Sequence, residues 1–429
     1  MNDLHERLYV DFKCKIENGI YKIDSKLPSI RKAALFYNVK EYYIYSTYDK
    51  LYKEGFIKRI PGKGYYVSSA SGKYFSNKES CNIVTNSMTC LNKNFFKNNT
   101  YRGIINDMFY NSLKTMYNNP IDLFLYNKSG IGRPSLRINL SKYLSRYLGI
   151  NILPDDIILS ASKINLVEYL YRIFNKKYIL LENPSSSYIK KIFAYGNFKI
   201  EYMNLNSEGI DLSSIPKSPS IFYIETHDQF PTGISYNQKC KEKLELLCNE
   251  MDHFILENLF RKDFLFEKQE YLYGIKNAFL IGDLSQIFPE SIRFAFMVKP
   301  RKFNLLNYES NISSITEDFV LSCFENNSLE RVSTKLWIML KEIRDKFIII
   351  LNKRKINHWC LSCGPYIVLE INNITTEWEI RNRLKVLDRD IAYEFFYLKN
   401  GKILFSFMYT DIKINKIEEF VDFLLFSKI

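Results

Sequence analysis

From about residue 120 onward, short apolar segments alternate with amphipathic helical patterns, and no other pattern in the chain limits its folds as strongly. The expected strands are DIILS, YILLENP, SIFYIETHD, HFILENLF and NAFLIGDLS. The expected helices carry apolar residues three and four positions apart and are LRINLSKYLSRYL, NLVEYLYRIF and KCKEKLELLCNEM. Strands that alternate with helices form a mainly parallel sheet covered on both faces. We therefore predict an α/β domain over residues 116–429.

Residues 1–69 have a different pattern and predict a separate, smaller α+β domain. HERLYVDFKCKIENGI and KEYYIYSTYDKLYKEG are amphipathic helices that end at a glycine, and a short helix that Ser29 can cap lies between them. The strands FIKRI and GYYV follow and meet at PGKG, whose glycines allow a hairpin turn. Three helices followed by a basic hairpin predict a winged helix-turn-helix, which binds double-stranded DNA with its third helix in the major groove.

This domain type assigns candidate DNA contacts. Basic side chains around the recognition helix contact phosphates, whereas the face of that helix nearest the bases reads them. Near the phosphates we expect Ser29, at the cap of the short second helix, together with Arg31, Lys32, Arg59 and Lys63. Near the bases we expect Lys40, Tyr42, Tyr43 and Ser46. A winged helix used only for protein contacts is the alternative.

The distribution of charge favours a polyanionic partner. The net charge is +13, and residues 1–67 contain 13 Lys and Arg against 8 Asp and Glu. Residues 68–115 contain 6 against 2, so the first quarter of the chain carries most of the excess. AT-rich codon bias is a second explanation, because Lys, Asn, Ile, Tyr and Phe are all over-used together.

The remaining composition predicts a linker and gives no sign of a membrane-spanning segment or a metal site. Residues 70–115 are expected to be a linker, because their first part is rich in Ser, Asn and Lys and lacks periodicity. No stretch approaches the ~20 apolar residues that span a bilayer, and there is no signal peptide, so we expect a cytoplasmic protein with no membrane partner. The eight cysteines are scattered, and only Cys360 and Cys363 are closely spaced, so no metal site is predicted.

Several N-terminal motifs resemble the GntR winged-helix domain. They are LPSIRKAA, YDKLYKEGFI and the wing PGKGYYV, together with Val39 and Ile44, in the same order and spacing. That family usually begins its recognition helix with Ser-Arg and has a threonine two positions later, whereas this chain has Lys40, Glu41 and Tyr43. Because an acidic group at the DNA-facing end repels phosphate, we predict an unusual sequence preference.

A winged helix of this type, followed by a linker and a large α/β domain, resembles the MocR subfamily of GntR regulators. There the second domain is similar to the fold type I aminotransferases, which bind pyridoxal phosphate. The landmarks that carry this resemblance occur in order and are GRPSLRINLSKYL, ILSASKINL, LENPSSSY, THDQFPTG, FILENLF and GDLSQIFPESIR. The resemblance covers nearly the whole chain and implies a homodimer that binds double-stranded DNA and can recognise a small-molecule effector.

The resemblance also implies where the cofactor would bind, and those positions have changed. Gln286, which follows Ser285, stands at the Schiff-base lysine, Asn258 at the acidic partner of the pyridine nitrogen, and Phe260 at the phenol. A glutamine amide is not nucleophilic, asparagine is not an anion, and phenylalanine has no hydroxyl. The phosphate turn has lost its glycine, and the cofactor-site residues that remain there are Ser160, Ala161, Ser162 and the more distant Arg293. We predict a degenerate cofactor site with no catalytic residue and no covalently bound cofactor.

Three interpretations follow. The favoured one is a DNA-binding transcription regulator whose aminotransferase-like domain has lost catalysis and serves dimerisation and effector binding. The second is a regulator that still binds pyridoxal phosphate non-covalently through Arg293 and the serines. The third, which Gln286 disfavours, is a working aminotransferase with a DNA-binding appendage.

Overall fold

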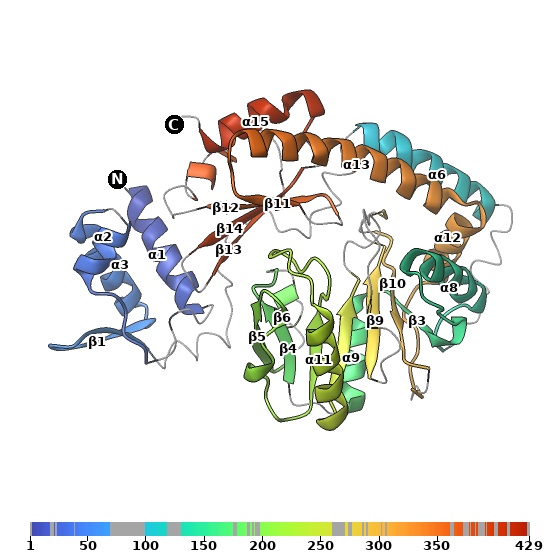
Figure 1. Ribbon diagram of the computed structural model, residues 1–429, viewed down its shortest axis with the longest axis horizontal. Coiled ribbons are helices and arrows are strands. Elements are labelled where there is room, and N and C mark those ends of the chain that lie inside the picture. Colours follow the sequence, from blue (N-terminus) through green and yellow to red (C-terminus); the bar gives the residue numbers. More distant parts are fainter. Residues whose placement is uncertain are drawn as a thin grey trace. The chain divides into compact units, whose positions relative to one another are not determined.

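Figure 1 shows the computed structural model of the chain, which folds into two compact units. The N-terminal unit contains residues 1–85, 372–379 and 399–402, and the large unit contains residues 86–371, 380–398 and 403–429. The structure describes residues 2–17, 21, 24–37, 39–68, 99–117, 130–174, 178–186, 189–190, 193, 198–259, 271–272, 277–284, 287–288, 291–301, 303–304, 307–360, 364–371, 377, 379–381, 383–384, 391, 393–398, 402–409 and 412–426. No helix among these residues is long and apolar enough to cross a membrane.

The N-terminal unit has the predicted winged helix-turn-helix fold. Its described N-terminal residues form helices α1 (Asn2–Glu17), α2 (Ile30–Tyr37) and α3 (Glu41–Lys53) and a hairpin of strands β1 (Ile57–Ile60) and β2 (Gly64–Val67). Apolar residues at helical spacing form its core, with Phe12 of α1 packed edge-on against Tyr48 of α3 at 5.0 Å between ring centroids. Gly62 and Gly64 have positive φ angles, which allow the tight turn of the hairpin. The predicted elements are therefore confirmed.

The large unit is built on a mainly parallel sheet of eight strands in the order β3-β10-β9-β8-β7-β4-β5-β6. Strands β5, β4, β7, β8 and β9 run parallel, whereas β10, β3 and β6 pair antiparallel with their neighbours. All five predicted strands form. The bounds are β3 (Ile157–Ser160), β4 (Tyr178–Asn183), β5 (Ile200–Asn206), β6 (Gly209–Ile210), β7 (Ser220–Ile224), β8 (Phe254–Asn258), β9 (Ala278–Asp283) and β10 (Ala295–Val298).

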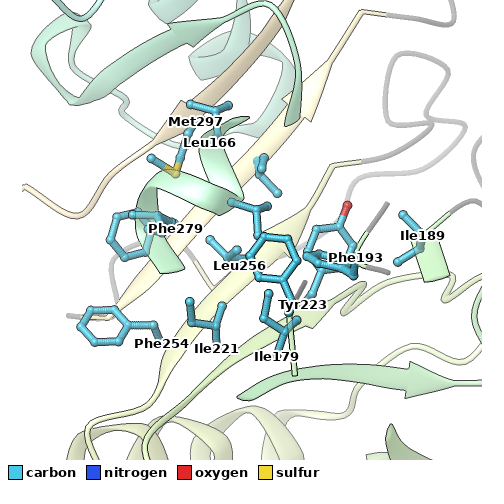
Figure 2. Close-up of a cluster of buried hydrophobic side chains, with 14 of the residues drawn as sticks. Leu166, Ile179, Ile189, Phe193, Ile221, Tyr223, Phe254, Leu256, Phe279 and Met297 are labelled. Atoms are coloured by element: carbon cyan, nitrogen blue, oxygen red, sulfur yellow. The ribbon is translucent and has the colours of Figure 1, made fainter. Parts of the chain in front are cut away.

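Helices cover both faces of this sheet, as the alternating pattern predicts. On one face, Leu166 of α9 (Lys163–Phe174) packs in a cluster with Leu256 and Phe279 of the central strands (Figure 2). On the other face, Leu244 of α11 (Gln238–Glu250) packs in a cluster with Ile255. Because neighbouring residues of a strand point to opposite faces, residues 255 and 256 of β8 enter different clusters.

The C-terminal part adds helices and a second sheet. Helices α12 (Ser314–Glu325), α13 (Ser328–Lys353) and α15 (Ile417–Leu425) accompany an antiparallel sheet in the order β11-β12-β14-β13. Its strands are β11 (His358–Cys360), β12 (Tyr366–Ile371), β13 (Tyr393–Tyr397) and β14 (Ile403–Met408). Short 3₁₀ turns are η2 (Pro154–Asp156), η3 (Leu212–Ser214) and η5 (Ile414–Lys416).

Helix α6 (Asn99–Tyr117) corrects the predicted extent of the linker. Residues 99–115 were expected to lie in the linker over 70–115, but they are helical and belong to the large unit. Ile105 and Met108, three positions apart, are buried, and Phe109 packs against Phe319 of α12 at 4.8 Å between ring centroids. Residues 69–98 lie outside the described residues.

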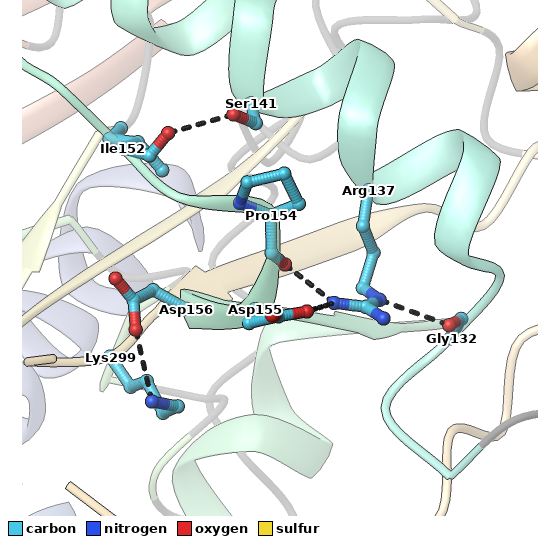
Figure 3. Close-up of polar contacts among 8 residues, drawn as sticks. All are labelled: Gly132, Arg137, Ser141, Ile152, Pro154, Asp155, Asp156 and Lys299. Atoms are coloured by element: carbon cyan, nitrogen blue, oxygen red, sulfur yellow. Dashed lines mark hydrogen bonds and ion pairs between the residues drawn. The ribbon is translucent and has the colours of Figure 1, made fainter.

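Buried polar contacts hold the start of strand β3 in place (Figure 3). The other end of this short strand, at Ser160, enters the candidate site. Arg137 of α8 (Pro134–Leu148) donates hydrogen bonds to the carbonyls of Gly132 and Pro154, at 3.2 and 2.6 Å. Lys299, which follows β10, pairs with Asp156 at 3.0 Å. The strand is therefore held at its first residues, at the end opposite Ser160.

Candidate functional site

The predicted phosphate-contacting residues lie on the surface of the N-terminal unit. Arg31 and Lys32 are exposed in the first turn of α2, and Arg59 and Lys63 are exposed on β1 and in the hairpin turn. The hydroxyl of Ser29 accepts a hydrogen bond from the Lys32 amide at 3.3 Å, so Ser29 caps α2 as predicted. Four cations are thus available to a polyanion.

The exposed face of α3 differs in two respects from the expected base-reading face, at Tyr43 and at Tyr45. Lys40 and Tyr42 are exposed, Tyr42 by 72%, and Ser46 is half-buried. Tyr43 is half-buried and packs against the core of the unit. Tyr45, 51% exposed, was not predicted, although it lies three positions after Tyr42 and therefore on the same face of the helix.

In the large unit, a buried polar network lies at the carboxyl edge of the parallel strands, where ligands of α/β sheets bind. Asn258, the last residue of β8, is 1% exposed and donates a hydrogen bond from Nδ2 to Glu225 Oε1 at 2.9 Å. The Lys163 ammonium forms an ion pair with Asp283 Oδ2 at 2.7 Å and lies 3.5 Å from Asn258 Oδ1. The ends of β8 and β9 and the start of α9 therefore meet through charged and amide groups.

A further carboxylate, Glu182, extends this network along the sheet. Glu182, on β4, accepts hydrogen bonds from the Tyr236 hydroxyl at 2.5 Å and from the Glu225 amide at 3.2 Å. Burial and the neighbouring Glu225 raise the pKa of the Glu182 carboxyl well above its usual range. A cavity of about 20 Å³, the space of roughly one water molecule, adjoins this pair and is lined by Leu181, Glu182, Ser185, Ser186, Ile189, Tyr223, Glu225, Gln229 and Phe230.

In the turn between β3 and α9, expected to hold the cofactor phosphate, several hydrogen-bond donors are engaged within the chain. The Ser160 hydroxyl and the Ala161 amide each donate to Asn311 Oδ1 at 2.9 Å. The Ser162 hydroxyl donates to Asn165. Asn311 lies 150 residues further along the chain, so no local pattern in the sequence could connect it to this turn.

Other predicted positions are not brought into this network. Phe260, Ser285 and Gln286 lie outside the described residues. Arg293 is exposed, just before β10, and has no hydrogen bond or ion pair with the residues that the structure describes. No group of three or more His, Cys, Asp or Glu side chains that could hold a metal ion occurs in the described part of the chain.

The residues present do not fit pyridoxal phosphate. The Asn258 amide is hydrogen-bonded to Lys163 and Glu225 and carries no negative charge, so it cannot serve as the anionic partner of a protonated pyridine nitrogen. The Asn311 oxygen occupies two donors of the turn, the Ser160 hydroxyl and the Ala161 amide, that a phosphate could otherwise use. Lys299 pairs with Asp156 at the opposite end of β3, away from this network. No catalytic step through this cofactor can be derived from the site.

The sequence of the chain is similar to those of transcriptional regulators, and its structure is similar to those of aminotransferases. No family model matches the chain. It is 25% identical over 421 residues to the HTH-type transcriptional regulator NorG of Staphylococcus aureus, covering 89% of this chain and 91% of NorG. It is 23% identical over 338 residues to the HTH-type transcriptional regulator YdeL of Bacillus subtilis, covering 76% of this chain and 72% of YdeL.

Two solved structures share the fold of the large unit. The kynurenine aminotransferase of Pyrococcus horikoshii matches with a TM-score of 0.59 and 17% identity, over 76% of this chain and 86% of that one. An archaeal alanine:glyoxylate aminotransferase matches with a TM-score of 0.59 and 14% identity, over 75% of this chain and 86% of that one. The large unit therefore has the aminotransferase fold.

Proposed function

We propose that this chain is a DNA-binding transcription regulator of the GntR/MocR type. It joins a winged helix-turn-helix to an aminotransferase fold and is similar to HTH-type transcriptional regulators. The observation that carries the proposal is the exposed basic surface of the N-terminal unit. Arg31, Lys32, Arg59 and Lys63 are exposed around α3, whose opposite face forms the core. This arrangement suits phosphate contacts on both sides of a helix in the major groove.

The salt dependence of DNA binding tests this proposal without knowledge of the operator. Each phosphate contact that is lost reduces the slope of log affinity against log salt by about 0.9. We expect an Arg31→Ala, Arg59→Ala double variant to bind a random-sequence duplex more weakly, with a slope smaller by about 2 units. Fluorescence anisotropy of a labelled duplex from low to moderate salt measures both quantities.

A matched control removes the same charge elsewhere. Lys142 and Lys239 are exposed on α8 and α11 of the large unit, so a Lys142→Ala, Lys239→Ala variant lowers the net charge equally. We expect this control to keep the wild-type slope. Equal slopes for wild type and the Arg31, Arg59 variant would reject the proposed DNA surface.

We further propose that the large unit does not catalyse transamination and serves dimerisation. A single winged helix buries a small interface on DNA, and such modules act in pairs on repeated half-sites. Asn258, bonded at both ends of its amide, cannot act as the acidic partner that activates the cofactor ring. Protein mixed with pyridoxal phosphate and reduced with borohydride should therefore carry no pyridoxyl group by mass spectrometry. A pyridoxyl group on a lysine of the large unit would reverse this conclusion.

A further inference from the structure

The position of Lys163 in the large unit is electrostatically unusual. It is the first residue of α9, where the helix dipole disfavours a positive charge. Its side chain is nevertheless 5% exposed and points inward to Asp283 and Asn258. Because a buried ammonium requires close compensation, this position is stable only where the chain supplies an anion and an acceptor. The carboxyl edge of the sheet supplies both.

Asn311 is hydrogen-bonded to the adjacent turn, between β3 and α9, where it acts as an acceptor. Its Oδ1 accepts from Ser160 and Ala161, which are hydroxyl and amide donors of the kind that bind anions at a helix start. The segment that carries Asn311 is fixed beside β3. The Tyr308 hydroxyl donates to the Leu159 carbonyl at 2.9 Å, and the Ser310 amide donates to the Gly130 carbonyl at 2.6 Å. The amide oxygen is therefore held in position.

We propose that these two side chains are built-in ligands that fill the former cofactor site. The Lys163 ammonium takes the place of a cationic ring against Asn258 and Asp283, and the Asn311 amide oxygen takes the place of a phosphate oxygen on the turn. The large unit is then stable without a small molecule, and added pyridoxal phosphate or phosphate finds its contacts already made. This inference builds on the proposed loss of the cofactor but is independent of DNA binding.

Removing Asn311 tests the anion end, with inorganic phosphate as the probe. In Asn311→Ala, the freed donors of the turn lower the melting temperature by about 2–6 °C, and phosphate restores part of it by binding there. Wild type should show no shift in phosphate relative to chloride at equal ionic strength. Asn277→Ala is the matched control, because the Asn277 side chain likewise makes two hydrogen bonds, in this case as the donor to the His253 and Cys248 carbonyls. It should lose stability without a response to phosphate.

An aspartate at the same position covers the case in which Asn311→Ala does not fold. Asn311→Asp places an anion at the start of α9 and keeps the same acceptor geometry, so we expect wild-type stability or slightly higher. A destabilised Asn311→Asp, an equal phosphate response in wild type, or a folded Asn311→Ala that ignores phosphate would each overturn the proposal. Because these measurements contain no DNA, their failure leaves the proposed regulator function intact.

Removing Lys163 tests the cationic end. Lys163→Ala leaves the half-buried Asp283 without its cation and opens a space, and the atoms that the substitution removes correspond to propylammonium. We expect a large fall in melting temperature that propylammonium partly reverses and that n-propanol, which lacks the charge, does not. Equal effects of the two additives would show that the space, rather than the cation, matters, and would overturn this half of the proposal. If Lys163→Ala does not fold, Lys163→Arg should fold and retain more stability than Lys163→Met, and the reverse order would also overturn it.

Discussion

Replacing Glu182 by glutamine should flatten the dependence of stability on pH. Burial and Glu225 raise the pKa of Glu182 well above its usual range, so the folded protein keeps a proton that the unfolded chain loses. An unfolded glutamate titrates near ~4.3. From that pH up to the raised pKa, wild-type stability therefore falls as pH increases. One retained proton contributes about 1.4 kcal/mol per pH unit across that window.

Glu182→Gln is neutral at every pH and lacks this contribution. The amide oxygen can still accept the hydrogen bond from Tyr236, but the amide nitrogen cannot accept the one from the Glu225 backbone. That loss costs about 1–3 kcal/mol and is the same at each pH. The diagnostic quantity is therefore the slope with pH, and the constant offset between the two proteins is set aside.

Urea unfolding followed by tryptophan fluorescence, from pH 5 to pH 8, measures this slope. Trp359 is a suitable reporter of the large unit, because its indole donates to the Pro231 carbonyl at 2.8 Å. Glu242→Gln, on the exposed surface of α11, is the matched control and should keep the wild-type slope. The same slope in wild type and Glu182→Gln would refute the reasoning, because it would mean that Glu182 carries no extra proton in the folded state.

Two further predictions concern Gly132, which lies against Leu159 of β3, and Gln286. Gly132→Ala should destabilise the large unit by roughly 1–3 kcal/mol, because its φ is 106° and an added Cβ would lie 2.7 Å from the Leu159 side chain. Gly103→Ala, in α6 with open space around it, should instead be neutral or stabilising, and thermal unfolding compares the two. Gln286→Lys should not restore transamination, because Asn258 remains without a negative charge. Turnover of an amino donor by Gln286→Lys would show that the loss of the acidic partner is not decisive.

The elements that sequence patterns predicted are those with strong local signals. β8 could be predicted because FILEN is a short apolar run that ends in polar residues, and consecutive side chains enter opposite cores. Helix α6 was missed because its Asn-rich surface obscures a narrow buried stripe, in which Ile105 and Met108 are three positions apart. A stripe of that width becomes clear only when its partner helices are known.

The candidate site could be located from the sequence but not completed. Asn258 was found because the turn and strand motifs preserve their order, whereas Asn311 joins the site through the tertiary fold alone. Lys163 did carry a local signal, because it lies three and four positions before Leu166 and Val167 on the buried stripe of α9. A lysine on an apolar helix face predicts a buried ion pair, but its partner could not be named from the sequence.

The central claim is that this protein is a dimeric regulator that binds a specific DNA sequence. The most direct test is footprinting of the protein on the DNA that flanks its own gene. We expect protection of two half-sites whose centres are separated by about one helical turn of 10–10.5 base pairs or a multiple of it. Protection should appear without added pyridoxal phosphate and should be lost in the Arg31→Ala, Arg59→Ala variant. Protection that required pyridoxal phosphate, or no protection at concentrations that bind random-sequence DNA, would contradict the account.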